Sequence, residues 1–528
     1  MNRKSIAKTL GGLAVLTLLA GNASAQNRIN VPNLMAERCS ICHADELGRL
    51  PRIQAQRKTP EGWLMTVVRM QRSHELRLTD DERRALVKHL ADTQGLAPAE
   101  TAPARYVLER RLNTVESFPS QQFTEMCARC HSGARVVLQR RTATEWERLV
   151  HFHLGQFPTL EYQALGRDRD WFNIALKEIA PALAKDFAYG DDAWQKWKLV
   201  KPAPVEGQWV VSGHLPGKGD FNATLTATLK DAQDANAKDQ YTLTLAGSYA
   251  DGEKLSGQGS AVIYTGYEWR GKVTINGVAY RQVFAIEGDT LRGRQFVAEH
   301  DEIGADIVAA RQGSGTSHVL AVQPAWLKTG AKTRLTIVGN DLAGEPELPA
   351  GIKVLKVLER TPGRIVVNAI ADRQALGTHK VKVGGVEGGD LAVFDKLARV
   401  EVVPPYAVAR VGGDGGSRPK VEARFEALGW ATGPQGEYRV GVVPAKWSVA
   451  PFNEDARRDR DLEFAGSIDG KSGVFTTNNA GLNPKRHLST NNAGNLTVVA
   501  SVANGGKALN AQGQLIVTVQ RWNDPPIP

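Results

Sequence analysis

Hydrophobic and polar residues follow two different periods along this 528-residue chain, and the period changes near residue 198. Before that point apolar residues recur at helical spacing, as in LTDDERRALVKHLADTQG, which opens with a capping box from Thr79 to Glu82. After it, segments such as QYTLTLAGSY from Gln240 alternate apolar and polar residues, which is typical of half-buried strands. The pattern predicts helices followed by a β scaffold.

Gly, Pro and Asn turns punctuate the β scaffold, and Asn276-Gly277 among them is a strong hairpin signal. A chain of this length exceeds what one hydrophobic core accommodates. We therefore expect a multidomain α plus all-β protein. Its predicted parts are an α-helical domain at residues 26–198, an antiparallel β barrel at 199–312, and two immunoglobulin-like antiparallel β-sandwiches at 313–397 and 398–528.

The first 25 residues have the pattern of a secretory signal peptide. Basic Arg3, Lys4 and Lys8 precede an apolar run over residues 10–20, and Ala23-Ser24-Ala25 forms a small-residue cleavage site. Later segments contain no run of about 20 apolar residues, the length that a membrane helix needs. We expect an exported protein with no membrane span.

All four cysteines stand in two short motifs, RCSICHAD and MCARCHSG. In an exported protein paired cysteines can form disulfides, and Cys-x-x-Cys can be a redox dithiol or half of a zinc site. Here a histidine directly follows each pair, and Cys-x-x-Cys-His is the attachment signature of c-type haem. Two such matches predict two covalently bound haem c groups. The predicted thioether residues and proximal iron ligands are Cys39, Cys42, Cys127 and Cys130, with His43 and His131.

An internal repeat follows the two motifs. RIQAQRKTPEGWLMTVVRM from Arg52 overlays RVVLQRRTATEWERLVHFH from Arg135 without a gap, so we expect two cytochrome-like units in tandem. Both segments should begin a helix, with Thr59-Pro60 as N-cap and N1 proline in one and a capping box from Thr142 to Glu145 in the other. The identical pairs are Arg52/Arg135, Gln56/Gln139, Arg57/Arg140, Thr59/Thr142, Trp63/Trp146 and Val67/Val150.

The overlay also predicts the distal iron ligands. Met70 falls opposite His153, and c-type haem accepts both methionine thioether and imidazole as axial ligands. We predict His43/Met70 ligation for the first haem and His131/His153 for the second. His74 shares the helical face of Met70 and is its alternative, whereas His151 lies about 200° from His153.

Other residues near these ligands are expected to be structural. Met65 lies about 140° from Met70 on the helix and should belong to the core. His89 sits in the second helix, where a packed or solvated histidine is the simpler interpretation. Trp63 and Trp146 should pack in the haem cavities, because tryptophan is a common large core residue.

The predicted axial ligands of the two haem irons indicate what the helical region does. Methionine ligation raises the iron potential relative to imidazole, so we expect electrons to pass from the His153 haem to the Met70 haem. Two axial ligands per iron leave no open position for a substrate, and we expect electron transfer without bond chemistry. The formal net charge is +10, or +7 without the three basic residues of the signal peptide. Without a concentrated Lys/Arg tract or nucleic-acid motif, this excess suits an acidic redox partner better than nucleic acid.

The order of signal peptide, CSICH and CARCH cytochrome unit and three β domains resembles the haem-bearing α subunit of bacterial quinohemoprotein amine dehydrogenase. VQPAWLKTGAKTRLTIVGNDL, which opens the third domain, contributes to this resemblance. The resemblance implies a periplasmic heterotrimer that oxidises primary amines to aldehydes and ammonia. Its other subunits are a β-propeller and a small subunit with a cysteine tryptophylquinone.

That quinone is built from a cysteine and a tryptophan, and every cysteine here is committed to haem. We therefore expect the quinone on the partner and no catalytic residue on this chain. This subunit would take electrons from the quinone and pass them to an external carrier such as a copper protein or cytochrome c. Two alternatives are a diheme peroxidase-like enzyme, which needs an iron that can open to peroxide, and a free-standing diheme electron-transfer cytochrome.

Overall fold

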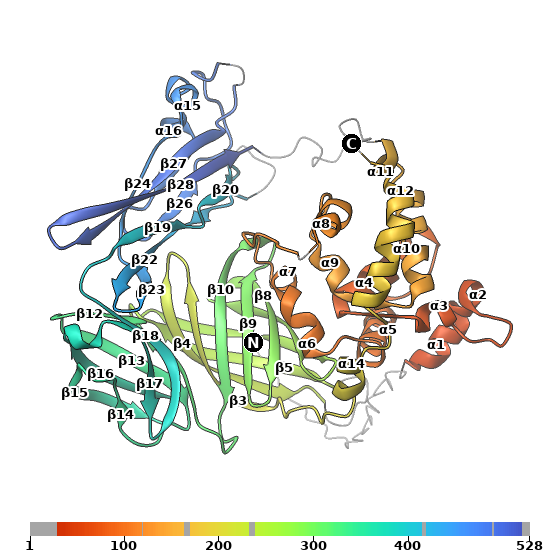
Figure 1. The fold of residues 1–528 in the computed structure, drawn as a ribbon, viewed down its shortest axis with the longest axis horizontal. Helices are drawn as coiled ribbons and strands as arrows, with labels where there is room; N and C mark the ends of the chain where they lie inside the picture. The colour runs from red at the N-terminus through yellow and green to blue at the C-terminus, as the bar shows by residue number, and fades with distance from the viewer. Residues whose placement is uncertain are drawn as a thin grey trace, which may run out of the picture.

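The computed structural model describes residues 29–118, 120–162, 169–231, 238–413, 419–487 and 490–519. Figure 1 shows a helical region, a β barrel at the centre and two further β units on the side of the barrel away from the helices. The predicted signal peptide, residues 1–25, lies outside the described residues. No helix in the described ranges is long and apolar enough to cross a membrane.

The helical region is built of short elements around three longer helices, α4, α5 and α10. Its elements are α1 (Val31–Arg38), α2 (Ser40–His43), α3 (Pro51–Gln54), β1 (Gln56–Lys58), α4 (Pro60–Ser73), α5 (Asp80–Thr93), α6 (Pro98–Thr101), η1 (Ala102–Ala104), α7 (Arg105–Leu108), α8 (Gln121–Cys127), α9 (Ala134–Val137), β2 (Gln139–Arg141), α10 (Ala143–Gln156), α11 (Thr159–Tyr162), α12 (Trp171–Ile174), η2 (Ala175–Ile179), α13 (Ala180–Asp186) and α14 (Asp192–Trp197).

The helix starts follow from local chemistry. Thr59 caps α4 by accepting a hydrogen bond from the Gly62 N–H, and Pro60 occupies the first helical position, as predicted. Thr79 and Glu82 form the predicted capping box at the start of α5.

Each repeat helix packs into its own hydrophobic cluster. Trp63 and Val67 of α4 contact Leu34 and the α5 side chains Leu86 and Leu90, whereas Trp146 and Val150 of α10 lie in a separate cluster with α13. Both tryptophans are 1% exposed, which confirms that they are packing residues. The helical region therefore contains two small cores, one for each repeat.

A short antiparallel ladder joins the two repeats. Strand β1 pairs with β2 so that Gln56 lies opposite Arg141, Arg57 opposite Arg140 and Lys58 opposite Gln139. The central pair joins equivalent positions of the sequence repeat, and the outer pairs exchange equivalent positions. The ladder thus has the register of a local two-fold axis through Arg57 and Arg140.

The central β unit is a closed barrel of eight strands in the order β10-β3-β4-β5-β6-β7-β8-β9, all paired antiparallel. The predicted hairpin turn at Asn276-Gly277 joins β7 to β8, with both residues at positive φ. The strands are β3 (Gly207–Leu215), β4 (Gly219–Leu229), β5 (Gln240–Tyr249), β6 (Lys254–Tyr264), β7 (Glu268–Ile275), β8 (Val278–Glu287), β9 (Thr290–Val297) and β10 (His300–Arg311).

The next β unit packs a sheet of order β11-β13-β16-β15 against one of order β12-β18-β17-β14, around a core that includes Leu335, Val367 and Leu391. Its elements are β11 (His318–Gln323), β12 (Trp326–Lys328), β13 (Thr333–Asn340), β14 (Pro346–Glu347), β15 (Ile352–Thr361), β16 (Arg364–Ala371), η3 (Arg373–Ala375), β17 (Gly377–Val383) and β18 (Val386–Phe394).

The last unit contains three sheets, of orders β19-β22-β23, β20-β28-β27-β24 and β21-β26-β25. Its elements are β19 (Arg399–Val403), β20 (Tyr406–Arg410), β21 (Ala423–Arg424), β22 (Glu426–Gly433), β23 (Gly436–Val443), β24 (Lys446–Pro451), α15 (Glu454–Arg458), α16 (Asp461–Phe464), β25 (Gly466–Ile468), β26 (Val474–Thr477), β27 (Gly494–Asn504) and β28 (Lys507–Thr518).

The expectation of purely antiparallel sheets is wrong in both of these units. Strand β12 runs parallel to β18, and β20 runs parallel to β28. In each case a short strand from the start of the unit joins the edge of a sheet next to a strand that comes much later in the sequence. Alternation predicts that such a segment is a strand, but it does not reveal its partner or its direction.

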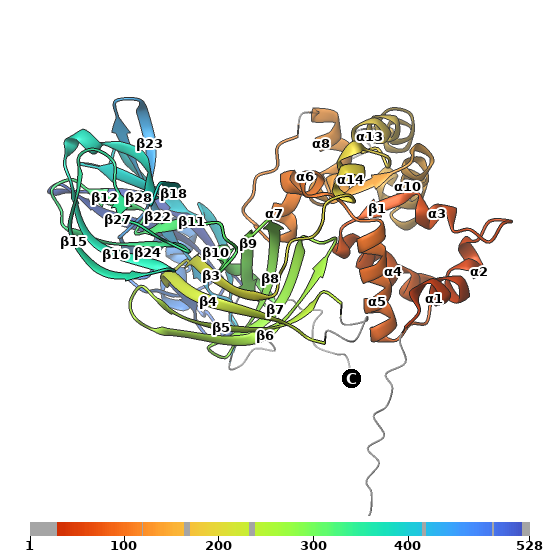
Figure 2. The same cartoon turned by 90° about the horizontal axis from the view of Figure 1, so that it is seen from below.

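The barrel contacts all three other parts, and both views place it between the helices and the two later β units (Figures 1 and 2). On the helical side Arg270 pairs with Glu61 at 2.5 Å, and the Trp197 indole donates to the Thr265 carbonyl at 2.9 Å. On the opposite side Gln323 donates to Ser212 at 2.9 Å. These contacts hold the barrel between the helical region and the later β units.

Candidate functional site

The first Cys-x-x-Cys-His motif forms a helical turn. The N–H groups of Cys42 and His43 donate to the Cys39 carbonyl at 3.3 and 3.0 Å, and α2 ends at His43. Residues three and four apart lie on one face of a helical turn. This turn therefore brings both sulfurs and the imidazole to one side of the chain.

The second motif begins where a helix ends. Cys127 is the last residue of α8, and residues 128–131 bend away from the helix axis. Burial raises the pKa of Cys127 to about 12, and burial also raises the pKa of Cys39, whereas Cys42 and Cys130 are exposed. None of the four cysteines is in a disulfide.

His43 carries an unsatisfied buried atom. Its Nδ1 has no hydrogen-bond partner in the described part of the chain. Burial, followed by the charges of Arg52 and His74, lowers the pKa of His43, and Glu145 opposes that shift. A buried polar nitrogen without a partner is costly. His43 therefore differs from an ordinary packed histidine, because the described part of the polypeptide does not hold its ring at Nδ1.

His131 and His153 are neighbours across the second unit. The Nδ1 atoms lie 2.9 Å from the Ser132 carbonyl and 2.8 Å from the Leu149 carbonyl, respectively. Burial lowers the pKa of His153, the hydrogen bond to Leu149 raises it, and the charge of His131 lowers it further. A backbone partner at Nδ1 fixes the ring orientation and leaves the Nε2 side of each imidazole for a metal, as is common in metal sites.

The first unit keeps two distal candidates. Helix α4 ends at Ser73, so His74 is its C-cap residue and is exposed, and its N–H donates to the Met70 carbonyl at 3.1 Å. Met70 is partly buried one turn earlier. Because the charge of His74 acts on His43, these two imidazoles are near each other. Met70 stays the predicted ligand and His74 its alternative.

Neighbouring histidines make ordinary packing contacts. His151 is exposed and packs edge-on against Phe172 at 5.1 Å between ring centroids, whereas the ring of His153 lies 6.3 Å from Trp171. His89 is half-buried on α5, and burial lowers its pKa.

Two predictions near the ligands are wrong. Met65 is 42% exposed rather than part of the core, and its sulfur accepts a hydrogen bond from Arg135 Nη2 at 2.9 Å. The capping box at Thr142 is only half formed, because Thr142 accepts from the Glu145 N–H while the Glu145 carboxylate contacts Arg52 and Arg148 instead. In both cases a partner from far along the chain changes the local structure.

The donor set fits haem c in both repeats. Each unit offers two thiols and an adjacent imidazole, with a second axial candidate that is His153 in one and Met70 or His74 in the other. Among the described residues no group of three or more His, Cys, Asp or Glu side chains is placed to hold a metal ion by itself. Haem supplies a one-electron redox centre when it is bound.

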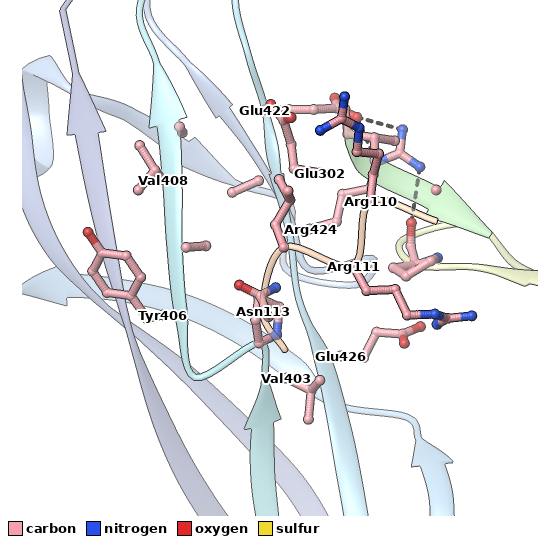
Figure 3. Close-up of a pocket in the computed structure, with 18 of the residues that line it drawn as sticks. Arg110, Arg111, Asn113, Glu302, Val403, Tyr406, Val408, Glu422, Arg424 and Glu426 are labelled. Atoms are coloured by element: carbon pink, nitrogen blue, oxygen red, sulfur yellow. Dashed lines mark hydrogen bonds and ion pairs between the residues drawn. The ribbon is translucent and has the colours of Figure 1, made fainter. Parts of the chain in front are cut away.

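A cavity of about 700 Å³ was not predicted from the sequence. It is lined by residues 110–114 after α7, by the end of the barrel and by β20 (Figure 3). Tyr406 and Val408 lie on β20, apart from charged side chains that include Arg111 and Arg424. Arg111 pairs with Asp306 at 2.7 Å and Arg424 with Glu422 at 2.5 Å. Its residues come from three separate parts of the chain, so no local pattern marks it.

His214 connects the barrel to the last β unit at the edge of this cavity. Its two ring nitrogens lie 2.6 Å from Asp220 and 2.5 Å from Glu426. Burial alone would lower the pKa of His214, but hydrogen bonds to both carboxylates raise it to about 10. His214 is therefore a protonated bridge between two units.

Four family models match consecutive parts of the chain. The model described as "Quinohemoprotein amine dehydrogenase A, alpha subunit, haem binding" covers residues 30–194. Models for domains II, III and IV of the same α subunit cover residues 202–312, 316–395 and 400–527. The first matched segment contains both Cys-x-x-Cys-His motifs, and the others follow the barrel and the two later β units.

Comparisons with individual proteins add little. A search of curated proteins found no match. A redesigned β-barrel structure is similar at 12% identity and a TM-score of 0.18, over 20% of this chain and 91% of its own. A SusE-like surface-located polysaccharide-binding protein from the Bacteroides thetaiotaomicron heparin utilisation locus is similar at 10% identity and a TM-score of 0.13, over 59% and 72%. Similarities this low carry no argument about function.

Proposed function

Because this chain belongs to the family of quinohemoprotein amine dehydrogenase α subunits, we propose that it is the diheme electron-transfer subunit of an amine dehydrogenase. Cys39 and Cys42 attach one haem, and Cys127 and Cys130 attach the other. His43 and His131 are the proximal ligands, with Met70 and His153 as the distal ones. The repeated placement of two thiols beside an imidazole carries this proposal.

The amine-oxidising centre belongs to a partner subunit in this proposal. A cysteine tryptophylquinone needs a cysteine of its own, and all four cysteines of this chain stand in the two haem motifs. The partner oxidises a primary amine to an aldehyde and ammonia, and this chain receives the electrons one at a time. It then reduces an external carrier, either a small copper protein or a cytochrome c.

The assembly is a periplasmic heterotrimer with a β-propeller subunit and a small quinone-bearing subunit. Export is supported by the basic, apolar and small-residue pattern of residues 1–25. The β units at residues 316–395 and 400–527 serve as immunoglobulin-like supports. Their sheets pack around separate cores, as in modules that act as scaffolds.

Mass spectrometry of the native complex tests the proposal directly. Purification from the periplasm through a tag on this chain should give two companion polypeptides, one of which carries a crosslinked quinone. Denatured, this chain should retain the mass of two haems, because thioethers survive denaturation. A chain that purifies alone with two haems would favour a free-standing cytochrome, and a ligand-accessible high-spin haem would favour a peroxidase-like enzyme.

A further inference from the structure

Carboxylates neutralise the positive charge on one face of the β1–β2 ladder but not on the other. Side chains of a strand alternate between faces, so Arg57 and Arg140 share one face while Lys58 and Arg141 share the other. On the first face Arg57 binds both oxygens of Glu100, at 2.9 and 3.0 Å. Arg140 lies 2.9 Å from Glu100 and 3.1 Å from Asp191. Two arginines thus meet two carboxylates, and the charges balance.

The second face has no such balance. Lys58 is 5% exposed, and its Nζ donates to the Thr66 hydroxyl at 2.8 Å and lies 5.0 Å from the centre of the Trp63 ring. Arg141 is 7% exposed and donates to the Gln139 side chain, while Glu145 stands 3.7 Å from it. Burying a cation without a close anion is costly.

Further cations surround this face, and Glu145 is the carboxylate that pairs with three of the arginines, Arg52, Arg141 and Arg148. Glu145 is 1% exposed. Its carboxylate lies 3.0 Å from Arg52 and 2.7 Å from Arg148. We define the inter-repeat basic cluster as Arg52, Lys58, Arg69, Arg135, Arg141 and Arg148.

Arg69 and Arg135 lie close to this group, but neither pairs with a carboxylate among the described residues. Arg69 stacks over the Phe152 ring at 4.5 Å, and Arg135 donates to the Met65 sulfur. The charges of Arg141 and Arg69, after burial itself, lower the pKa of Lys58 well below its ordinary value. The positive charges of the cluster therefore repel one another.

The inter-repeat basic cluster is close to both candidate iron sites. Arg52 and Glu145 act electrostatically on His43, in the first unit. Arg141 and Arg69 act on His153, in the second. Arg69 and Phe152 immediately precede the distal candidates Met70 and His153. Both predicted haems should therefore border the same charged region.

We propose that the inter-repeat basic cluster binds the propionate carboxylates of both haems and thereby holds them around a common positive charge. The inference rests on the proposed attachment of two haems. The cluster holds five arginines, one lysine and one carboxylate, and two haems bring four propionates. Guanidinium groups are well suited to bind carboxylates through paired hydrogen bonds. The cluster members without an ion pair in the described part of the chain, Lys58, Arg69 and Arg135, then gain carboxylate partners.

The cluster should also change the midpoint potentials of the two haem irons. A fixed positive charge disfavours the ferric state relative to the ferrous state, because reduction removes one positive charge from the iron. Cations shared by both haems should therefore raise both midpoint potentials. Arg52 should act mainly on the first haem and Arg141 mainly on the second.

Redox titration and resonance Raman spectroscopy of the full chain with its haems test this inference. Arg141→Gln and Arg52→Gln each remove one charge, and Arg52 is half-exposed, so its variant should fold even if the other does not. We expect a roughly tenfold lower reduction equilibrium constant for the nearer haem, which is about 59 mV for one electron. The propionate bending bands in the Raman spectrum should shift as well.

Two further variants complete the test. Arg141→Lys keeps the charge and should retain most of the wild-type potential, whereas Arg84→Gln on α5 removes an exposed arginine outside the cluster and should leave potentials and Raman bands unchanged. Wild-type propionate bands in both cluster variants would overturn the inference, as would potential shifts no larger than that of Arg84→Gln. A chain without covalent haem would instead sink the proposed function.

Discussion

Arg57 lies directly opposite Arg140 in the β1–β2 ladder, and the two occupy equivalent positions of the internal repeat. Like charges facing each other across a ladder are destabilising unless they are neutralised. Here the buried carboxylate of Glu100 binds both guanidinium groups, and Asp191 contacts both. A single acid pair thus joins the two repeats of the helical region.

Removing one of these arginines should destabilise the helical region. Arg57→Met leaves Glu100 buried with one partner fewer, and breaking a buried ion pair costs about 3–5 kcal/mol. Denaturant unfolding followed by helical circular dichroism measures the loss. Arg83→Gln is the control, because its exposed pair with Asp80 should contribute about 1 kcal/mol or less. Equal losses in the two variants would contradict the role of Glu100.

Met70→Ala should change the spectrum of one haem only. Loss of the thioether removes the absorption signature of methionine ligation, while the bis-imidazole signature of the other haem persists. Low-temperature electron paramagnetic resonance and near-infrared absorption read the two haems separately. His74→Ala is the matched control and should retain the methionine signature. If His74→Ala changes the spectrum of one haem and Met70→Ala changes neither, His74 is the distal ligand.

His153→Ala should remove the bis-imidazole signature. Its Nδ1 is bound to the Leu149 carbonyl, so the ring is already oriented as a ligand would be. His151→Ala should leave that signature intact, because His151 packs against Phe172 at the surface. Magnetic circular dichroism distinguishes the two variants. Identical spectra for both would show that the repeat register misidentifies the ligand.

Replacing Cys127 and Cys130 together with serine should reduce covalent haem from two groups to one. Thioether attachment requires the sulfurs, and Cys127 packs against a hydrophobic cluster that contains no residue of the first motif. Intact-protein mass spectrometry after denaturation counts the attached groups. A chain that still carries two haems would exclude the second motif as an attachment site.

The His214 bridge predicts a pH dependence of stability. The pKa of His214 is raised from an ordinary value of 6.5 to about 10 in the folded chain. Its stabilising contribution is therefore complete below pH 6.5 and is lost as the pH rises to about 10. The thermal unfolding temperature should fall between pH 6.5 and about pH 10, and it should fall less in His214→Asn. An equal fall in the wild-type chain and in His214→Asn would show that another group causes the pH dependence.

Local patterns in the sequence predicted the elements whose structure is decided locally. Strand β5 spans Gln240–Tyr249, which is the quoted alternating segment, and its burial alternates in the same way. The positive φ angles of Asn276 and Gly277 follow from residue types that tolerate them. The capping box at Thr79 needs only residues within one helical turn.

Distant partners account for what the sequence did not predict. Glu145 has the spacing of a capping box but meets Arg52, which lies far away in the chain, and a charged hydrogen bond outweighs a local cap. Met65 faces Arg135 across the repeat boundary. The parallel strands β12 and β20 and the cavity beside β20 likewise depend on segments that meet only after folding.

The symmetric register of β1 and β2 has a consequence for how the two repeats stay together. Three residue pairs would be too few to hold two free polypeptides in register at ordinary dilution. Because both strands belong to one chain, each meets the other at a high effective concentration that does not change with dilution. Covalent linkage thus favours, at any concentration of the protein, a contact that separate copies could form only at high abundance.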